Sequence, residues 1–127
     1  MEIRNHILIV EESFDISLIT SKIFQYQNWQ VTKASTGEEA LSFLNSNNVD
    51  IILMDINLPG MSGIECCDKI RHMPDKLKSV TPIIAVTANA LEFDLNEYKK
   101  RGFTYFFQKP VFFDKLIDKI KSILHRK

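Results

Sequence analysis

Apolar residues occur along this chain in short, unbroken runs that polar segments separate. Four runs have the length of a β-strand, and one weaker β-prone stretch lies between the first two. The five segments are residues 7–10, 29–34, 51–54, 83–86 and 105–107. Because apolar and polar residues do not alternate within the runs, they predict strands that are covered on both faces, as in a parallel sheet.

Between these runs, apolar residues recur three or four positions apart, which predicts five amphipathic helices. In chain order the apolar stripes are Ile16, Ile19, Ile23 and Phe24; Ala40, Leu41 and Leu44; Ile64, Cys67 and Ile70; Leu91, Leu95 and Tyr98; and Phe113, Leu116, Ile117, Ile120 and Leu124. Strand and helix alternate without a low-complexity linker or a repeat. The pattern predicts a single α/β domain, a five-stranded parallel sheet that is doubly wound with right-handed crossovers.

The composition agrees with one soluble globular domain. Of 127 residues, 45% are hydrophobic and 25% charged, and 16 basic residues balance 16 acidic ones. This balance gives no overall field that favours nucleic acid or a membrane surface. The longest uncharged stretch, 79–91, is too short for a membrane span and no signal peptide opens the chain, so we expect a cytoplasmic protein. Cys66 and Cys67 are sequence neighbours, which indicates reduced packing residues rather than a disulfide framework.

Polar side chains follow the predicted strands where each strand ends. Glu11 and Glu12 follow the first, Asp55 the third, Thr87 the fourth and Lys109 the fifth. In doubly wound sheets, ligands bind outside the carboxyl ends of the strands, near the point where the strand order reverses. These side chains are therefore expected to converge on one edge of the sheet.

Taken singly, each of these residues also has an ordinary structural interpretation. The two glutamates suit the first turn of a helix that begins near Ser13, where the helix dipole favours negative charge. Asp55 could hydrogen-bond the following turn, Thr87 or Asn89 could cap the fourth helix, and Lys109 could be a surface lysine.

Their conjunction indicates a metal-assisted site. Carboxylates crowded at a strand edge repel one another unless a cation lies among them, and oxygen ligands suit a hard divalent ion such as Mg²⁺. Lys109 can pair with a carboxylate or phosphoryl oxygen, and Thr87 can donate a hydrogen bond to the latter. These are the groups needed for phosphoryl transfer to a carboxylate nucleophile.

Three stretches then carry a resemblance to a known family: IILMDINLPGMSG at 51–63, IIAVTANA at 83–90 and YFFQKP at 105–110. The chain resembles the receiver domains of two-component response regulators over residues 5–124. The resemblance implies a flavodoxin-like, CheY-like (βα)5 fold. It also implies that residues 1–127 form one receiver domain, with a core of about 5–124 and no output domain.

The resemblance assigns roles to the residues at the strand ends. Asp55 is the expected phosphoacceptor, with Thr87 and Lys109 as its catalytic partners. Mg²⁺, or Mn²⁺ in its place, is the expected cofactor. The implied metal ligands are Glu11, Glu12, Asp55 and the backbone carbonyl of Asn57.

It assigns further roles to the neighbouring loops and strand. Thr87 and Phe106 are the expected switch residues. Because Phe106 lacks a phenol hydroxyl, its part in the switch would depend on packing alone. The alternative is that Phe106 is simply a core residue. The side chains of Asn57 and Asn89 lie where the family tunes dephosphorylation, and the bond that precedes Pro110 is expected to be cis.

The implied partners are proteins. A phosphohistidine on a histidine kinase or a histidine phosphotransfer domain would donate the phosphoryl group, and the receiver would catalyse its own phosphorylation and dephosphorylation without being a conventional enzyme. A downstream protein would bind the face of the fourth helix, fifth strand and fifth helix, where Tyr98, Tyr105 and Phe106 cluster, although Tyr98 also suits the core. No direct contact with nucleic acid or membrane is expected. The phrases MDINLPGMSG and AVTANAL are similar to receivers of hybrid histidine kinases, so a stand-alone receiver and a piece of a longer chain both remain open.

One position departs from the family pattern. Receivers favour aspartate at the position of Glu12. A glutamate side chain is one methylene longer, so a metal ion at this site must shift, bind Glu12 through a water, or not bind at all. Glu12 could instead reach Lys109 and fix an activated shape, which gives the alternative of a phosphorylation-independent interaction module. A flavin-binding relative is disfavoured because EESF, residues 11–14, would repel a bare phosphate, and motif order and length disfavour an aspartyl-phosphate hydrolase.

Overall fold

A five-stranded parallel sheet forms the centre of the molecule in the computed structural model, which describes residues 4–89 and 91–125. The strand order is β2-β1-β3-β4-β5, and the order reverses between β1 and β3. The strands are β1 (His6–Val10), β2 (Gln30–Ala34), β3 (Ile51–Asp55), β4 (Ile83–Thr87) and β5 (Tyr105–Gln108). All five predicted strands and the doubly wound α/β fold are confirmed.

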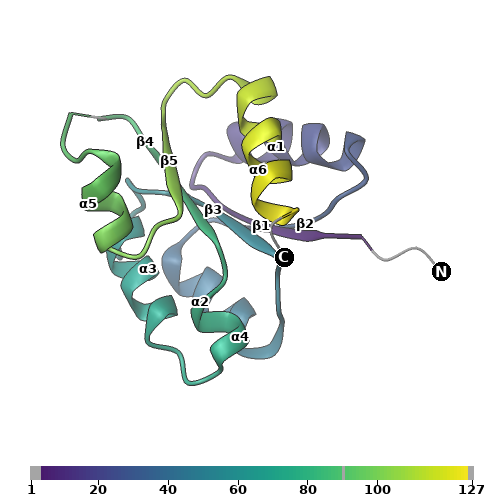
Figure 1. Cartoon of the computed structure of the whole chain (residues 1–127). Coiled ribbons are helices and arrows are strands. Elements are labelled where there is room, and N and C mark those ends of the chain that lie inside the picture. The colour runs from purple at the N-terminus through teal and green to yellow at the C-terminus, as the bar shows by residue number, and fades with distance from the viewer. Residues whose placement is uncertain (1–3, 90, 126–127) are drawn as a thin grey trace.

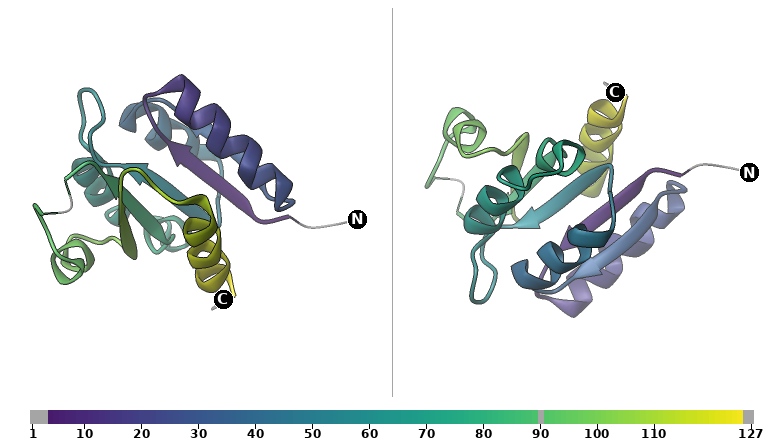
Figure 2. Two further views of the ribbon diagram at one scale, coloured as in Figure 1. Left: turned by 90° about the horizontal axis from the view of Figure 1, so that it is seen from above. Right: turned by 90° about the horizontal axis from the view of Figure 1, so that it is seen from below.

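Helices cover both faces of the sheet (Figures 1 and 2). One face carries α1 (Phe14–Tyr26) and α6 (Phe113–Leu124). The other carries α2 (Gly37–Ser46), α3 (Gly63–Arg71) and α5 (Leu95–Lys100), with the short α4 (Lys76–Ser79) beyond α3. The sequence pattern did not predict α4, because four residues are too few to show a helical period.

Side chains that precede the helices fix where the helices begin. Ser13, Thr36, Ser62 and Asp94 each accept a hydrogen bond from the backbone N–H three residues further on. This contact satisfies one of the donors that a helix N-terminus leaves unpaired. The cap of α5 is therefore Asp94, and the alternative that Thr87 or Asn89 caps this helix is wrong.

Each face of the sheet has its own apolar core. The first core lies between the sheet and the helices α2, α3 and α5, and includes Leu8, Ile52, Leu44, Ile70 and Tyr98. The second lies beneath α1 and α6, and includes Ile9, Leu53, Phe24, Leu116 and Ile120. Strands buried on both faces explain why the sequence shows continuous apolar runs.

The apolar stripe predicted for α1 is only partly correct. Ile16 and Ile19 are 47% and 53% exposed, whereas Phe24 is buried as expected. The residues of α1 that face the sheet are instead Ser17, Thr20 and Ser21, and the Thr20 hydroxyl donates to the carbonyl of Ile16 at 2.7 Å. Small side chains whose hydroxyls find backbone acceptors can occupy a buried face, which a search for apolar residues does not detect.

The predicted fourth helix begins later than its apolar pattern indicated. Leu91 lies outside α5 and is 96% exposed, while Leu95 and Tyr98 are in the helix. Asp94, three residues after Leu91, caps the helix at Leu95, so Leu91 belongs to the preceding loop.

Both cysteines should be unreactive in the folded protein. Cys66 and Cys67 are free and buried in α3, and burial raises the pKa of their thiols to about 12 and about 11. The reactive thiolate is therefore scarce even at mildly alkaline pH. We expect a disulfide reagent such as Ellman's reagent to modify both thiols only after unfolding in guanidinium chloride; rapid modification of either thiol in the native protein would contradict this.

In the part of the chain that the structure describes, no helix has both the length and the apolar character needed to cross a membrane.

Candidate functional site

The carboxyl ends of the central strands bring the predicted residues to one edge of the sheet. Strand register places Val10 beside Met54, Asp55 beside Val86, and Thr87 beside Gln108. Glu11 and Lys109 each come one residue beyond a strand end, and thus reach the level of Asp55 from either side. The edge lies where the strand order reverses, as expected for a ligand site in this architecture.

Asp55 is a buried carboxylate with a partner on each oxygen. Its exposed fraction is 4%. One oxygen, Oδ1, accepts the backbone N–H of Asn57 at 3.0 Å, and Oδ2 accepts the ammonium of Lys109 at 3.2 Å. The predicted turn contact and the predicted pairing with Lys109 are therefore both present. Asp55 is held in one orientation before any ligand arrives.

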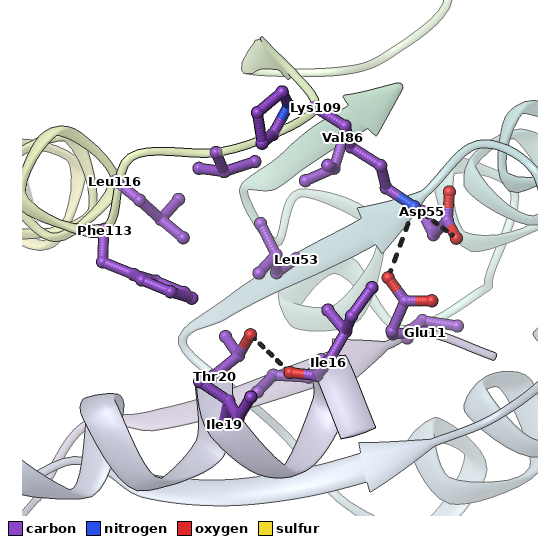
Figure 3. Close-up of a pocket in the computed structure, with 14 residues that line it drawn as sticks. Glu11, Ile16, Ile19, Thr20, Leu53, Asp55, Val86, Lys109, Phe113 and Leu116 are labelled. Atoms are coloured by element: carbon purple, nitrogen blue, oxygen red, sulfur yellow. Dashed lines mark hydrogen bonds and ion pairs between the residues drawn. The ribbon is translucent and has the colours of Figure 1, made fainter. Parts of the chain in front are cut away.

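Glu11 supplies a second buried carboxylate on the other side of Lys109 (Figure 3). Its Oε1 lies 3.5 Å from the Lys109 Nζ, and its Oε2 accepts the backbone N–H of Ser13 at 2.9 Å. Burial raises the pKa of Glu11 and the nearby Asp55 carboxylate adds to this, while Ser13 and Lys109 act in the opposite direction. One ammonium therefore serves two carboxylates, and the site carries excess negative charge.

Glu12 does not join this group. Its side chain is exposed, and in the described residues it is Glu11, not Glu12, that pairs with Lys109. The alternative in which Glu12 forms an ion pair with Lys109 is therefore wrong. The role of Glu12 as a metal ligand stays a prediction.

The donor set at this edge fits a hard divalent cation. Within residues 4–89 and 91–125, no group of three or more acidic, histidine or cysteine side chains is placed to hold a metal. Mg²⁺, however, commonly uses one or two carboxylates and keeps several waters. Glu11 and Asp55 provide two oxygen donors whose charge Lys109 only partly neutralises. These two residues are the ones that would hold the ion.

Thr87 and Asn89 form a local pair at the end of β4. Thr87 is buried, and its hydroxyl accepts the backbone N–H of Asn89 at 3.1 Å and makes a long contact of 3.4 Å as donor to the Asn89 carbonyl. The side-chain oxygen of Asn89 accepts the backbone N–H of Leu91. In this state Thr87 binds its own loop rather than Asp55.

The remaining predicted residues lie on and beside β5. Phe106 is half-buried and its ring stacks on Tyr98, with centroids 4.7 Å apart. The Lys109–Pro110 peptide bond is cis, as expected. Tyr98 is fully buried, which confirms its core role and removes it from any surface cluster for a partner.

An apolar cavity of about 500 Å³ opens from the two carboxylates and Lys109 and extends between α1 and α6 (Figure 3). Its apolar walls include Ile16, Ile19, Leu53, Phe113 and Leu116. The sequence did not predict this cavity, because the predicted apolar stripe of α1 left out Thr20, whose small side chain is buried and lines the cavity. The inward-facing hydroxyl residues of α1 were the available signal.

Neutralising Glu11 should stabilise the metal-free protein at neutral pH. The raised pKa means that the folded state binds a proton at Glu11 more tightly than the unfolded state, so ionisation lowers stability as pH rises above the usual glutamate range. Glu11→Gln keeps an acceptor for Ser13 and removes that cost. We expect a higher melting temperature at neutral pH in EDTA and no gain at acid pH, where Glu11 is protonated in both states.

The control is Glu12→Gln, which changes an exposed neighbour and should leave the melting temperature nearly unchanged at either pH. A Glu11→Gln protein that is no more stable than the parent at neutral pH would show that Lys109 fully compensates the buried charge.

The chain has relatives among signalling proteins. The family model of the response regulator receiver domain matches residues 7–121. The sensor kinase/phosphatase CqsS of Vibrio cholerae is 32% identical over 91% of the chain, which spans 17% of that protein. Sporulation initiation phosphotransferase F of Bacillus subtilis is 28% identical over 93% of the chain and 92% of its own length.

Solved structures agree with these sequence relatives. The chemotaxis response regulator CheY4 of Vibrio cholerae has a TM-score of 0.86 at 26% identity, covering 95% of this chain and 99% of its own. A two-component response regulator from Clostridium difficile has a TM-score of 0.88 at 25% identity, covering 97% and 98%. These relatives give no support to a phosphorylation-independent module, and the Glu12 ion pair on which that alternative depended is not formed. The chain belongs to the response regulator receiver domain family and is a receiver domain of two-component signalling.

Proposed function

We propose that this receiver accepts a phosphoryl group on Asp55 from a phosphohistidine. The observation that carries the proposal is the buried Asp55 carboxylate at the sheet edge, with the Lys109 ammonium 3.2 Å from one of its oxygens. A carboxylate held in place beside a cation is a positioned nucleophile, and the same cation can interact with the incoming phosphoryl oxygens.

The transfer breaks the P–N bond of the phosphohistidine and forms an O–P bond to an Asp55 oxygen. The imidazole leaves with the electron pair of the P–N bond and takes a proton from solvent. The Lys109 ammonium, which contacts both Glu11 and Asp55, would move to the phosphoryl oxygens as their negative charge comes close to Asp55. The Thr87 hydroxyl would turn from the Asn89 carbonyl toward one phosphoryl oxygen. Later attack by water on phosphorus would regenerate Asp55.

Receiver domains generally use Mg²⁺ in this reaction. Glu11 and Asp55 would hold the ion here, with the Asn57 carbonyl as a further ligand. When bound, the ion would neutralise charge on the transferring phosphoryl group. Glu12 lies outside this set and would contribute through water at most.

We place the phosphodonor against α1 and the loop before α6. Ile16, Ile19 and Phe112 are large apolar side chains exposed beside the sheet edge that carries Asp55. An exposed apolar patch next to a reactive group favours a protein partner, here a histidine kinase or a histidine phosphotransfer domain. We place this exchange in the cytoplasm.

We place the downstream protein on the face formed by α5, β5 and α6. Tyr105 is partly exposed there, with the Lys119 ammonium 4.0 Å from the centre of its ring. This face is built from residues other than Ile16, Ile19 and Phe112. The two surfaces could then serve different partners, whether the receiver acts alone or within a longer chain.

Intact-mass measurement tests the proposal. The protein is incubated with Mg²⁺ and acetyl phosphate, beside Asp55→Asn and, as a matched control, Asp68→Asn at an exposed aspartate of α3. We expect one phosphoryl adduct on the parent and on Asp68→Asn and none on Asp55→Asn. An adduct on Asp55→Asn would place the phosphoacceptor elsewhere, and no adduct on the parent, even with a histidine phosphotransfer donor, would refute phosphorylation.

A further inference from the structure

The phenol of Tyr98 is enclosed by aromatic rings beneath α5. Its side chain is fully buried, and the rings of Phe93 and Phe103 meet it edge-on at centroid distances of 5.5 Å and 5.6 Å. The ring of Phe106 stacks on it from β5 at 4.7 Å. Phenylalanine would make these ring contacts equally well, so the packing does not require the hydroxyl.

The Tyr98 hydroxyl is nevertheless buried and makes no hydrogen bond within the part of the chain that the structure describes. An unsatisfied buried hydroxyl destabilises the folded state, because it has lost its hydrogen bonds to water. Buried polar groups in folded proteins usually have a partner, and a group without one points to a partner gained in another state. A neighbour of the Tyr98 hydroxyl must therefore be able to become its partner in that state.

Thr87 is the neighbour placed to do so. Burial raises the pKa of Tyr98, and among its neighbours the Thr87 hydroxyl acts on the phenol as a hydrogen-bonding group that lowers this pKa, although the two hydroxyls do not yet meet the geometry of a hydrogen bond. A threonine hydroxyl has one proton and two lone pairs. The Asn89 N–H occupies one lone pair, and the long contact to the Asn89 carbonyl holds the proton weakly. One lone pair therefore remains for the phenol.

We propose that Tyr98 is a positioning residue for Thr87 and carries the phosphorylation signal into α5, an inference that rests on the proposed function. When the Thr87 hydroxyl turns its proton to a phosphoryl oxygen on Asp55, its remaining lone pair comes within reach of the Tyr98 hydroxyl, which donates to it. The stacked Tyr98 and Phe106 rings then shift together, and α5 moves with them. Tyr98 thus supplies the phenol that Phe106 lacks, so this switch uses a hydrogen bond as well as packing.

Tyrosine labelled with ¹³C at Cζ gives a direct readout by NMR, because the Cζ shift reports hydrogen bonding of the phenol. The chain has three tyrosines, and Tyr98→Phe identifies the Tyr98 resonance by its loss. On phosphorylation with acetyl phosphate and Mg²⁺, we expect the Tyr98 signal to shift while that of Tyr26, 92% exposed, stays in place. A Tyr98 signal that stays fixed while the adduct forms would overturn the assignment.

Tyr98→Phe then separates signalling from folding. We expect unchanged or higher thermal stability, a normal phosphoryl adduct, and loss of at least half of the phosphorylation-induced amide shifts in Leu95–Lys100. Tyr105→Phe, which removes a half-buried phenol from β5, should keep those shifts. If the phosphorylation-induced amide shifts of α5 are the same in Tyr98→Phe as in the parent, Tyr98 is a packing residue only and the proposal is overturned. No adduct on the parent would overturn the proposed function and this inference together, whereas a parent adduct with an unresponsive Tyr98 would overturn the inference alone.

Discussion

Replacing Gly63 with alanine is expected to lower the free energy of unfolding by about 3 kcal/mol, the upper end of the usual range for overpacking. A Cβ at Gly63 would lie 2.3 Å from the carbonyl oxygen of Asp55 and 2.8 Å from the Cα of Ile56. Both obstacles are backbone, so no side-chain rotation can relieve the clash. Gly63 also donates its N–H to the Ile56 carbonyl at 2.9 Å, which fixes α3 against the end of β3.

Gly37→Ala is the matched control. Gly63 and Gly37 each follow a Ser or Thr N-cap as the first residue of a helix, but the nearest atom to a Cβ at Gly37 is the flexible Met61 sulfur at 3.0 Å. We expect Gly37→Ala to change stability by less than about 1 kcal/mol. Urea unfolding of both variants tests this. Equal, small changes in the two would show that α3 can move away from β3 at little cost.

Replacing Lys109 with methionine is expected to impair both chemistry and stability. Methionine keeps most of the aliphatic length but leaves Glu11 and Asp55 facing one another without a cation. Removing one member of a buried charge cluster costs about 3 kcal/mol or more, and loss of a charge that stabilises the transition state slows transfer by about 100-fold or more. Urea unfolding in EDTA and the initial rate of adduct formation from acetyl phosphate measure the two effects.

The stability loss in Lys109→Met should depend on pH and on metal. Without the ammonium, nothing from Lys109 opposes the effect of burial that raises the pKa of Glu11, so the loss is small at acid pH and grows as pH rises through the glutamate range. Mg²⁺ should recover part of the loss at neutral pH. Lys115→Met, an exposed lysine in α6, is the control and should be near the parent throughout. A Lys109→Met protein as stable as the parent in EDTA at neutral pH would contradict the shared-cation arrangement.

The sheet was predictable from sequence because its central strands β1, β3 and β4 are buried on both faces, and burial on both faces produces continuous apolar runs. The buried faces of the helices were less predictable from sequence. In α1 the buried face is made by Phe24 together with Ser17, Thr20 and Ser21, whose hydroxyls make them look polar in a linear pattern. Apolar spacing identified the helix but predicted burial for Ile16 and Ile19, which are about half exposed at the wall of the cavity.

Part of the candidate site was also predictable, because parallel strands bring their carboxyl ends to one edge. The sequence could place Asp55 and Lys109 there, and the structure shows their contact. It could not say which of two consecutive glutamates faces Asp55, since that depends on how the chain leaves β1. Nor could the sequence show that Tyr98 lies near Thr87, because the two residues become neighbours only when α5 packs beneath β4 in the folded protein.

The course of α6 has a consequence for how such a receiver can be joined to other domains. β1 starts and α6 ends at the edge of the sheet opposite Asp55, where Leu124 packs in the same core as Trp29, just before β2. A linker to a neighbouring domain would therefore leave from the pole opposite the phosphoacceptor. In a longer protein such as CqsS, of which this chain matches 17%, a receiver tethered in this way could swing on its linker and present Asp55 to a donor without the tether crossing its path.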